Sequence, residues 1–204
     1  LGGLWRLRGR LDRADRAFRE AIRLYERMGD PEGAAYARCG LAGVRRLRGR
    51  YRDSLRLYTE ANRAFARSGD RFGRAYSHCG IANARRMLGD RATAHRHFAA
   101  AERLYRAIGD RVSYAYTLWG EATLYKVEGA LDRARELYRE AARLFRLTGD
   151  ERGLAYADLG LGELALLRGR LGTARRRFAR ARERAAAHGH GFEALHARYF
   201  LALA

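Results

Sequence analysis

One short motif recurs at a fixed interval and constrains the fold of this chain more than any other feature. AYARCG at Ala35–Gly40 returns as AYSHCG, AYTLWG and AYADLG, and equivalent residues are always 40 positions apart. Each copy places a glycine inside a segment that otherwise reads as a helix, where glycine costs about 1 kcal/mol relative to alanine. The same penalty at one fixed spacing indicates that this glycine has a packing role in a repeated unit.

Two further series of glycines divide each unit into two helices. The first series forms GD pairs, and the second lies midway between them. The members are Gly29, Gly69, Gly109 and Gly149, with Gly189 on the next interval, and then Gly9, Gly49, Gly89, Gly129 and Gly169. Glycine after an apolar periodic run usually ends a helix. We therefore predict antiparallel hairpins of two helices, each of roughly 17 residues.

The second helix of each unit carries a regular apolar stripe in which aromatic residues alternate with small ones. In one unit the stripe consists of Tyr51, Ser54, Tyr58, Ala61 and Phe65. Equivalent stripes begin at Leu11, Ala94, Leu131 and Leu171. Steps of three and four residues place such a stripe on one face of a helix. We predict that these faces form the core.

These motifs resemble the tetratricopeptide repeat (TPR), with Tyr156-x-x-Leu159-Gly160 in a first helix and Gly169, Leu171, Ala174, Phe178 and Ala181 in the second. The 40-residue period is most similar to the long TPR variety of large bacterial ATP-binding regulators and scaffold proteins. The resemblance implies an all-α, right-handed superhelical solenoid of helical hairpins over residues 1–204. Its predicted parts are a partial repeat 1–28, repeats 29–68, 69–108, 109–148 and 149–188, and a C-terminal helix 189–204.

The sequence leaves open which face of the first helices is packed. Gly49 lies nine positions after Gly40, whereas the glycine between the two helices of the short TPR lies seven positions after the small residue of the first helix. The small position is therefore either Gly40 or Ala42. Exposed charge is the norm for arginine. On that ground we assign the face of Tyr36 and Gly40 to the core, and we expect Tyr36, Tyr76, Tyr116 and Tyr156 to be buried. If Ala42 is the small position, the tyrosines line the groove instead.

With the tyrosines buried, the variable face of the first helices lines the concave groove, where the resemblance implies ligand binding. The candidate groove residues are Arg38, Arg45, Arg74, His78, Arg85, Tyr114, Glu121, Tyr125 and Asp158. Arginine pairs with carboxylate or phosphate in two-pronged fashion, and tyrosine adds contact area. The leading hypothesis is a non-enzymatic protein-interaction scaffold that holds an acidic peptide or partner segment. A solvated arginine-rich face is the simpler interpretation of the same residues.

Two other functions remain open. A sensory or coupling module of a bacterial regulator would bind a small molecule near Tyr114, Glu121 and Tyr125. Arginine-rich surfaces also bind nucleic acids without specificity, which the formal net charge of +19 permits. The run RRRFARARER at 175–184 lacks interleaved exposed aromatic residues, and we assign it to a solvated outer surface.

Catalytic and metal-binding motifs are not found in the sequence. It has no phosphate-binding loop, GxSxG or HExxH motif, and the pair His95 and His97 is spaced so that the rings diverge on a helix. His188, His190 and His196 have no obvious completing ligand. We therefore expect no enzyme activity, no metal and no cofactor.

Composition favours a cytoplasmic protein. Cys39 and Cys79 occupy equivalent positions and are expected to be reduced thiols, because packed helices lie ~8–10 Å apart. No apolar run approaches the ~20 residues of a membrane span. The chain opens and closes halfway through a first helix, so we expect either a longer array or self-association through open ends.

Overall fold

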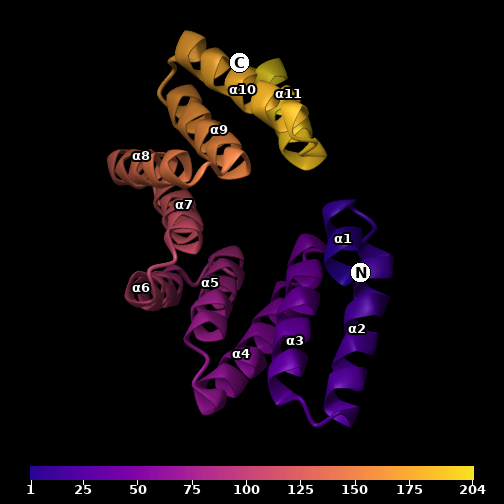
Figure 1. Cartoon of the computed structure of the whole chain (residues 1–204). Coiled ribbons are helices and arrows are strands. Elements are labelled where there is room, and N and C mark those ends of the chain that lie inside the picture. The colour runs from indigo at the N-terminus through magenta and orange to yellow at the C-terminus, as the bar shows by residue number, and fades with distance from the viewer. The chain divides into compact units, whose positions relative to one another are not determined.

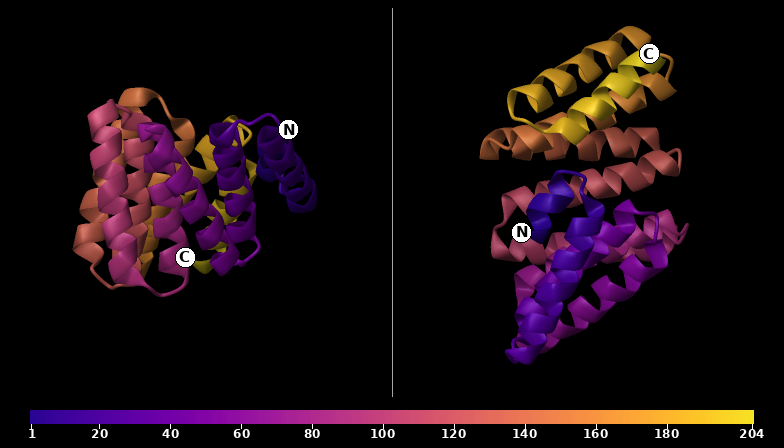
Figure 2. Two further views of the ribbon diagram at one scale, coloured as in Figure 1. Left: turned by 90° about the horizontal axis from the view of Figure 1, so that it is seen from below. Right: turned by 90° about the vertical axis from the view of Figure 1, so that its right-hand side faces the viewer.

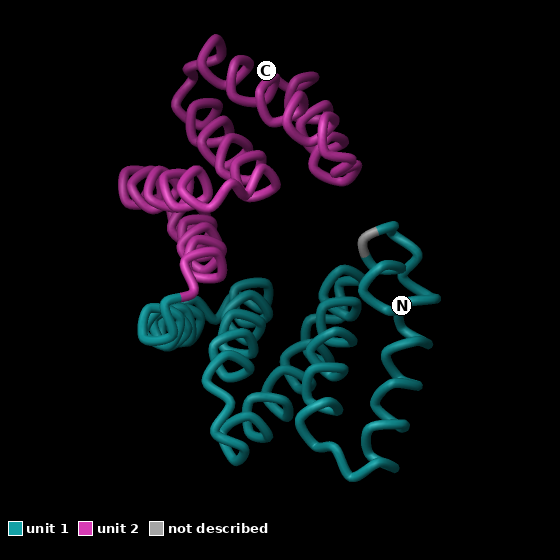
Figure 3. Tube along the Cα trace, viewed as in Figure 1, with its two compact units in different colours: residues 1–109 teal, residues 110–204 magenta. Residues whose placement is uncertain are grey.

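The computed structural model describes residues 1–6 and 8–204, and all regular structure in that part of the chain is α-helical (Figure 1). The chain divides into two compact units between Gly109 and Asp110 (Figure 3). Unit 1 contains α1 (Gly2–Leu7), α2 (Leu11–Arg27), α3 (Pro31–Leu47), α4 (Tyr51–Ser68), α5 (Arg71–Met87) and α6 (Arg91–Ile108). Unit 2 contains α7 (Arg111–Val127), α8 (Leu131–Thr148), α9 (Glu151–Leu167), α10 (Leu171–Ala187) and α11 (Gly191–Leu203).

The helix boundaries predicted from the glycines are confirmed. All ten glycines of the two boundary series adopt positive φ, between 68° and 84°, which ends each helix without the strain that a side chain would add. The aspartate of each GD pair then starts the next helix. Asp30, Asp70 and Asp150 each accept a hydrogen bond from the backbone N–H three residues later, at 2.8 Å.

Within each unit, helices that follow one another in the chain pack side by side (Figure 2). Odd-numbered helices also contact the next odd-numbered helix, as α3 does with α5 and α7 with α9. Even-numbered helices in the described part of the chain make no such contact with one another. Thus α3 contacts α1 and α5 as well as α2 and α4, and α9 contacts α7 and α11 as well as α8 and α10.

The predicted stripes of the even-numbered helices form the core. Ser54, Ala61 and Phe65 of α4 are fully buried, and Tyr58 is 5% exposed. The same holds for Ala94, Phe98, Ala101 and Tyr105 of α6, for Ala134, Tyr138, Ala141 and Phe145 of α8, and for Ala174, Phe178 and Ala181 of α10. Three-residue and four-residue steps therefore identified most of the buried face of these helices, but Leu171 at the start of the α10 stripe is 49% exposed and Tyr25 of the α2 stripe is 36% exposed.

The motif glycine receives an aromatic ring of the preceding helix. A Cβ atom built at Gly40 would lie 2.1 Å from the Phe18 ring, one at Gly80 would lie 2.3 Å from Tyr58, and one at Gly160 would lie 2.6 Å from Tyr138. No side chain can approach a ring so closely. The missing side chain therefore permits the ring to lie against the backbone, and this packing offsets the cost of glycine in a helix.

We expect Gly80→Ala to lower the free energy of unfolding by about 1–3 kcal/mol, because the added methyl group must displace the packed Tyr58 ring. Gly172→Ala is the matched control, since the nearest atom to its new Cβ would be an arginine terminus at 3.7 Å. The control should be neutral or slightly stabilising. Urea denaturation of both variants measures the difference, and equal stability would show that the glycine has no packing role.

Candidate functional site

The tyrosines of the first helices are not buried as we predicted. Tyr36 is 37% exposed, and Tyr76, Tyr116 and Tyr156 are half-buried. Ala35 and Ala42 are instead completely buried, as are the equivalent Ala75, Ala82, Ala115, Ala122 and Ala155. Gly40 and Ala42 are both buried, so the packed side of α3 includes both small positions, and the tyrosines lie on the more open side of the odd-numbered helices.

The prediction about the tyrosines was wrong because it assumed that the arginines of the opposite face are exposed. Arg45, predicted to be exposed, is 5% exposed, and its Nη2 lies 2.9 Å from Asp15 Oδ2 of α2. Asp158, also predicted to be exposed, is 7% exposed, and its Oδ1 lies 2.7 Å from Arg177 Nη1 of α10. Charged side chains on this face are paired by the flanking even-numbered helices, which permits their burial. We use the term wedge for the space that an odd-numbered helix encloses with the two even-numbered helices before and after it in the chain.

The other predicted site residues also take part in packing and local pairs. Arg38 of α3 is half-buried and pairs with Glu26 of α2, and Arg85 of α5 pairs with Asp90 at 3.0 Å. Tyr114 and Tyr125 of α7 pack against the core cluster of unit 2. Arg74 and Glu121 are half-buried. Several predicted residues thus form ion pairs within the chain, and Tyr114 and Tyr125 contribute to packing.

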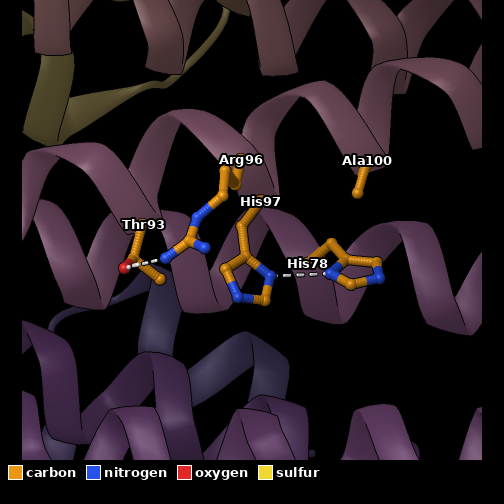
Figure 4. A pocket seen from close by; sticks show the side chains of 5 residues that line it. All are labelled: His78, Thr93, Arg96, His97 and Ala100. Atoms are coloured by element: carbon orange, nitrogen blue, oxygen red, sulfur yellow. Dashed lines mark hydrogen bonds between the residues drawn. The ribbon is translucent and has the colours of Figure 1, made fainter.

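His78 is the predicted site residue that lines a pocket. The pocket has a volume of about 320 Å³ and lies between α5 and α6, with Thr93, Arg96, His97 and Ala100 as its other lining residues (Figure 4). The Nδ1 atoms of His78 and His97 lie 2.8 Å apart, so one ring donates a hydrogen bond to the other. His78 lies on α5 and His97 lies on α6. The spacing of His95 and His97 along one helix therefore could not predict this contact.

Burial keeps this histidine pair neutral. It lowers the pKa of His78 to about 4, and the neighbouring His97, Arg74 and Arg103 act in the same direction. Burial also lowers the pKa of His97, with further lowering by Arg85 and Arg96, while Asp90 opposes it. Each facing ring uses its Nδ1 in the mutual hydrogen bond. The pair is therefore a packed polar contact rather than a proton donor at neutral pH.

The open side of the odd-numbered helices in unit 1 combines aromatic, apolar and basic side chains. We call it the odd-helix face of unit 1 and define it by Arg6, Tyr36, Arg46, Leu47, Phe72, Tyr76, Asn83, Arg86 and Met87. Leu47 is 44% exposed and Met87 is 40% exposed. The Tyr36 hydroxyl donates a hydrogen bond to Asp70 Oδ2 at 2.7 Å, which links α3 to α5. Burial and this carboxylate raise the pKa of Tyr36.

Three arginines follow this face at intervals of 40 residues. Arg6, Arg46 and Arg86 are half-buried, and Arg6 Nη1 lies over Gly43, where a Cβ atom would be 2.6 Å away. Arg6 and Arg46 make no ion pair within the described residues. These arginines are not among the predicted site residues, although their spacing is visible in the sequence, because we assigned this face to the core.

The equivalent face of unit 2 is neutralised by its own carboxylates. Lys126 of α7, which is equivalent to Arg86, forms an ion pair with Glu163 of α9. Arg152 Nε donates to Glu193 Oε1 at 2.8 Å, and the Arg152 guanidinium lies 5.7 Å from the centre of the Tyr156 ring. Burial of Glu193 would raise its pKa, but hydrogen bonds from Tyr156 and Arg152 lower it.

Two further features concern ligands and membranes. Within residues 1–6 and 8–204, no three His, Cys, Asp or Glu residues are grouped as metal ligands would be. Cys39 and Cys79 form no disulfide in the described part of the chain, and burial raises the pKa of Cys39 to about 12. Among the described helices, none has the length and apolar character that crossing a bilayer would require.

Breaking the Arg45–Asp15 pair should be costly. We expect Asp15→Asn to lower the free energy of unfolding by about 3 kcal/mol, since it leaves a buried guanidinium without its counter-charge. The double variant Asp15→Leu/Arg45→Met should lose much less, because it removes both charges. Glu20→Gln, which breaks the exposed pair with Arg23, is the control and should cost under about 0.5 kcal/mol. Chemical denaturation gives all three values. A loss for Asp15→Asn as small as that of the control would contradict burial of the pair.

The histidine pair predicts a pH dependence of stability. Both folded-state pKa values lie below the ordinary 6.5, so between pH 6.5 and about 4 the unfolded chain binds more protons than the folded one. The contribution of the neutral histidine pair to the free energy of unfolding is complete above pH 6.5 and is lost as the pH falls towards 4. We expect His78→Gln to reduce this loss by about 1 kcal/mol, after allowance for solvent screening.

Chemical denaturation across this pH range measures the effect against His188→Gln, which replaces an exposed histidine. Identical pH profiles for wild type and His78→Gln would contradict the assignment of neutral rings.

Comparison with known proteins supports the fold. No protein-family model matches the chain, and no curated protein matches it either. Among solved structures, BtubC (BKLC) from P. vanneervenii is similar with a TM-score of 0.70, 20% identity and coverage of 93% of this chain and 78% of that one. A Rap protein complexed with Competence and Sporulation Factor has a TM-score of 0.72 at 15% identity. This chain is covered over 98% of its length and spans 60% of that Rap chain.

A third similar structure carries the repeat in its description. It is a putative kinesin light chain from Podosopora anserina with nearly identical TPR-like repeats, with a TM-score of 0.62, 14% identity and 92% coverage of both chains. These identities are too low to transfer a function, but they agree with the helical hairpins described above. The chain therefore has the fold of the TPR-like helical-repeat proteins.

Proposed function

We propose that this protein is a non-enzymatic protein-interaction scaffold that holds an acidic partner segment against the odd-helix face of unit 1. The observation that carries the proposal is the row of Arg6, Arg46 and Arg86 beside Tyr36 and the exposed apolar side chains. Arg6 and Arg46 of this row make no ion pair within the described residues, whereas Arg38 and Arg45 pair with carboxylates of α2.

The chemistry of the face fits a peptide with carboxylates and apolar anchors. Arginine presents a planar fork that engages a carboxylate through two parallel hydrogen bonds. Tyr36 and Tyr76 offer rigid area with little loss of side-chain entropy, and Leu47 and Met87 add apolar surface. An acidic segment would also be attracted by the net charge of +19.

Other evidence is consistent with a scaffold. The similar Rap protein was solved in complex with Competence and Sporulation Factor, which supports partner binding as a use of this fold. The sequence contains no motif for covalent or acid–base catalysis. Unit 2 has a more neutral odd-helix face because Lys126 and Arg152 are paired, so the acidic segment would select unit 1.

The test uses two sets of labelled peptides that alternate apolar residues with either Asp and Glu or Lys and Arg. We expect the acidic set to bind, and Arg46→Glu/Arg86→Glu to weaken this binding at least about tenfold, because it places two repelling charges on the face. Fluorescence anisotropy at near-physiological salt gives the dissociation constants.

Arg63→Glu/Arg67→Glu is the matched control, since both arginines are exposed on α4 and the change in net charge is the same. The control should bind the acidic set with nearly wild-type affinity. Equal weakening by both double variants would indicate only a nonspecific charge effect. Equal binding of both peptide sets would reject an acidic partner.

A further inference from the structure

The wedge between α8 and α10, over α9, contains a pocket that is rich in arginine. Its volume is about 100 Å³, and it is lined by Arg135, Arg139, Leu161, Leu164, Ala165, Arg168, Arg170, Thr173 and Arg177. Five arginines thus line one small space, two from α8, two from the turn between α9 and α10, and one from α10. Like charges gathered in this way repel one another unless an anion lies among them.

The equivalent wedge of α2, α3 and α4 shows how unusual this arrangement is within the chain. There, Asp15 of α2 and Arg45 of α3 fill the space as an ion pair. At the positions 120 residues later stand Arg135 and Ala165, so the carboxylate is replaced by a guanidinium and the long side chain by a methyl group. Asp53, which pairs with Arg50 at 2.5 Å, is likewise replaced by Thr173.

The remaining carboxylates do not neutralise the pocket. Asp132 lies 2.8 Å from both Arg135 and Arg168, so one carboxylate serves two guanidinium groups. Asp158 lies 2.7 Å from Arg177 and also 3.6 Å from both Arg180 and Arg184.

Two of the lining arginines are exposed to solvent. Arg139 and Arg170 make no ion pair in the described part of unit 2. Arg135 Nε is buried without a hydrogen-bond acceptor. The pocket therefore retains donors and positive charge that its own carboxylates leave unsatisfied.

We propose that this pocket binds a phosphate group, supplied either as free phosphate or as a phosphoryl group on another molecule. A volume of about 100 Å³ is roughly that of three water molecules, which suits one small oxyanion and is below the ~300 Å³ at which pockets for larger ligands begin. A phosphate dianion carries more oxygens than a carboxylate and can engage several guanidinium forks together. Thr173 adds a hydroxyl group at the rim.

The phosphate site is independent of the proposed acidic partner. It lies in unit 2 among residues of α8, α9 and α10, whereas the odd-helix face of unit 1 consists of residues of α1, α3 and α5. Loss of one binding activity therefore leaves the other to be measured separately.

Isothermal titration of the full chain with inorganic phosphate, against sodium chloride at equal ionic strength, tests the proposal. We expect Arg139→Gln/Arg170→Gln to weaken phosphate binding at least about tenfold, since it removes the two guanidinium groups that have no internal carboxylate. A parallel titration with phenyl phosphate distinguishes the sources. Tighter binding of inorganic phosphate indicates a site for free phosphate, and tighter binding of the ester indicates a phosphoryl group on another molecule.

Arg175→Gln/Arg182→Gln is the matched control, because both arginines are exposed on α10 outside the pocket and the net charge falls equally. The control should bind phosphate as the wild type does. Circular dichroism verifies that both double variants remain folded. Equal affinities for the two variants, or no phosphate binding beyond the sodium chloride reference, would overturn the proposal.

Discussion

The packing of an aromatic ring against a glycine backbone is the interaction on which the rest of the structure depends. Each such ring lies on an even-numbered helix; Gly40, Gly80 and Gly160 lie on the odd-numbered helix that follows the ring, and Gly162 lies on the one that precedes it. Phe18 and Gly40 make one of these contacts, and Tyr25 makes a second at Gly33, where a Cβ atom would lie 2.5 Å from its ring. Two contacts seven residues apart set both the rotation and the translation of one helix on the next. They thereby decide which side chains point into the wedges and which remain on the open side.

The sequence was sufficient for the helices and for the core of the even-numbered ones. Glycines at regular spacing marked every boundary because positive φ is readily available only to glycine. The stripe of α4 was recognisable because one of its faces is apolar and the other charged. Both predictions depend on local rules, because the residues that determine a helix end or an apolar face lie close together in the chain.

The orientation of the odd-numbered helices could not be obtained in this way. In α3, buried residues occur on most of the circumference, and small side chains such as Ala34, Ala37 and Gly43 leave no clear apolar stripe. The burial of Arg45 depends on Asp15, which is 30 residues away on another helix. The rule that arginine is exposed fails where a neighbouring helix supplies a carboxylate that pairs with the arginine. The equivalent charges at positions 12 and 48, which recur as Asp132 and Arg168, are a signal of such pairing that the sequence does contain.

The excess of arginine is therefore not one uniform surface property. In the first wedge, the guanidinium of Arg45 is stabilised by a carboxylate, and its long side chain completes the packing between helices. In the wedge over α9, an alanine replaces that side chain, while arginines occupy the rim. On the odd-helix face the contrast is reversed, because Arg6 and Arg46 of unit 1 make no ion pair within the described residues, whereas Lys126 and Arg152 of unit 2 pair with internal carboxylates. A repeat that preserves its backbone contacts can thus change the charge of either face by single substitutions. The glycine and aromatic positions maintain the fold, so the positions between them are free to determine what each unit binds.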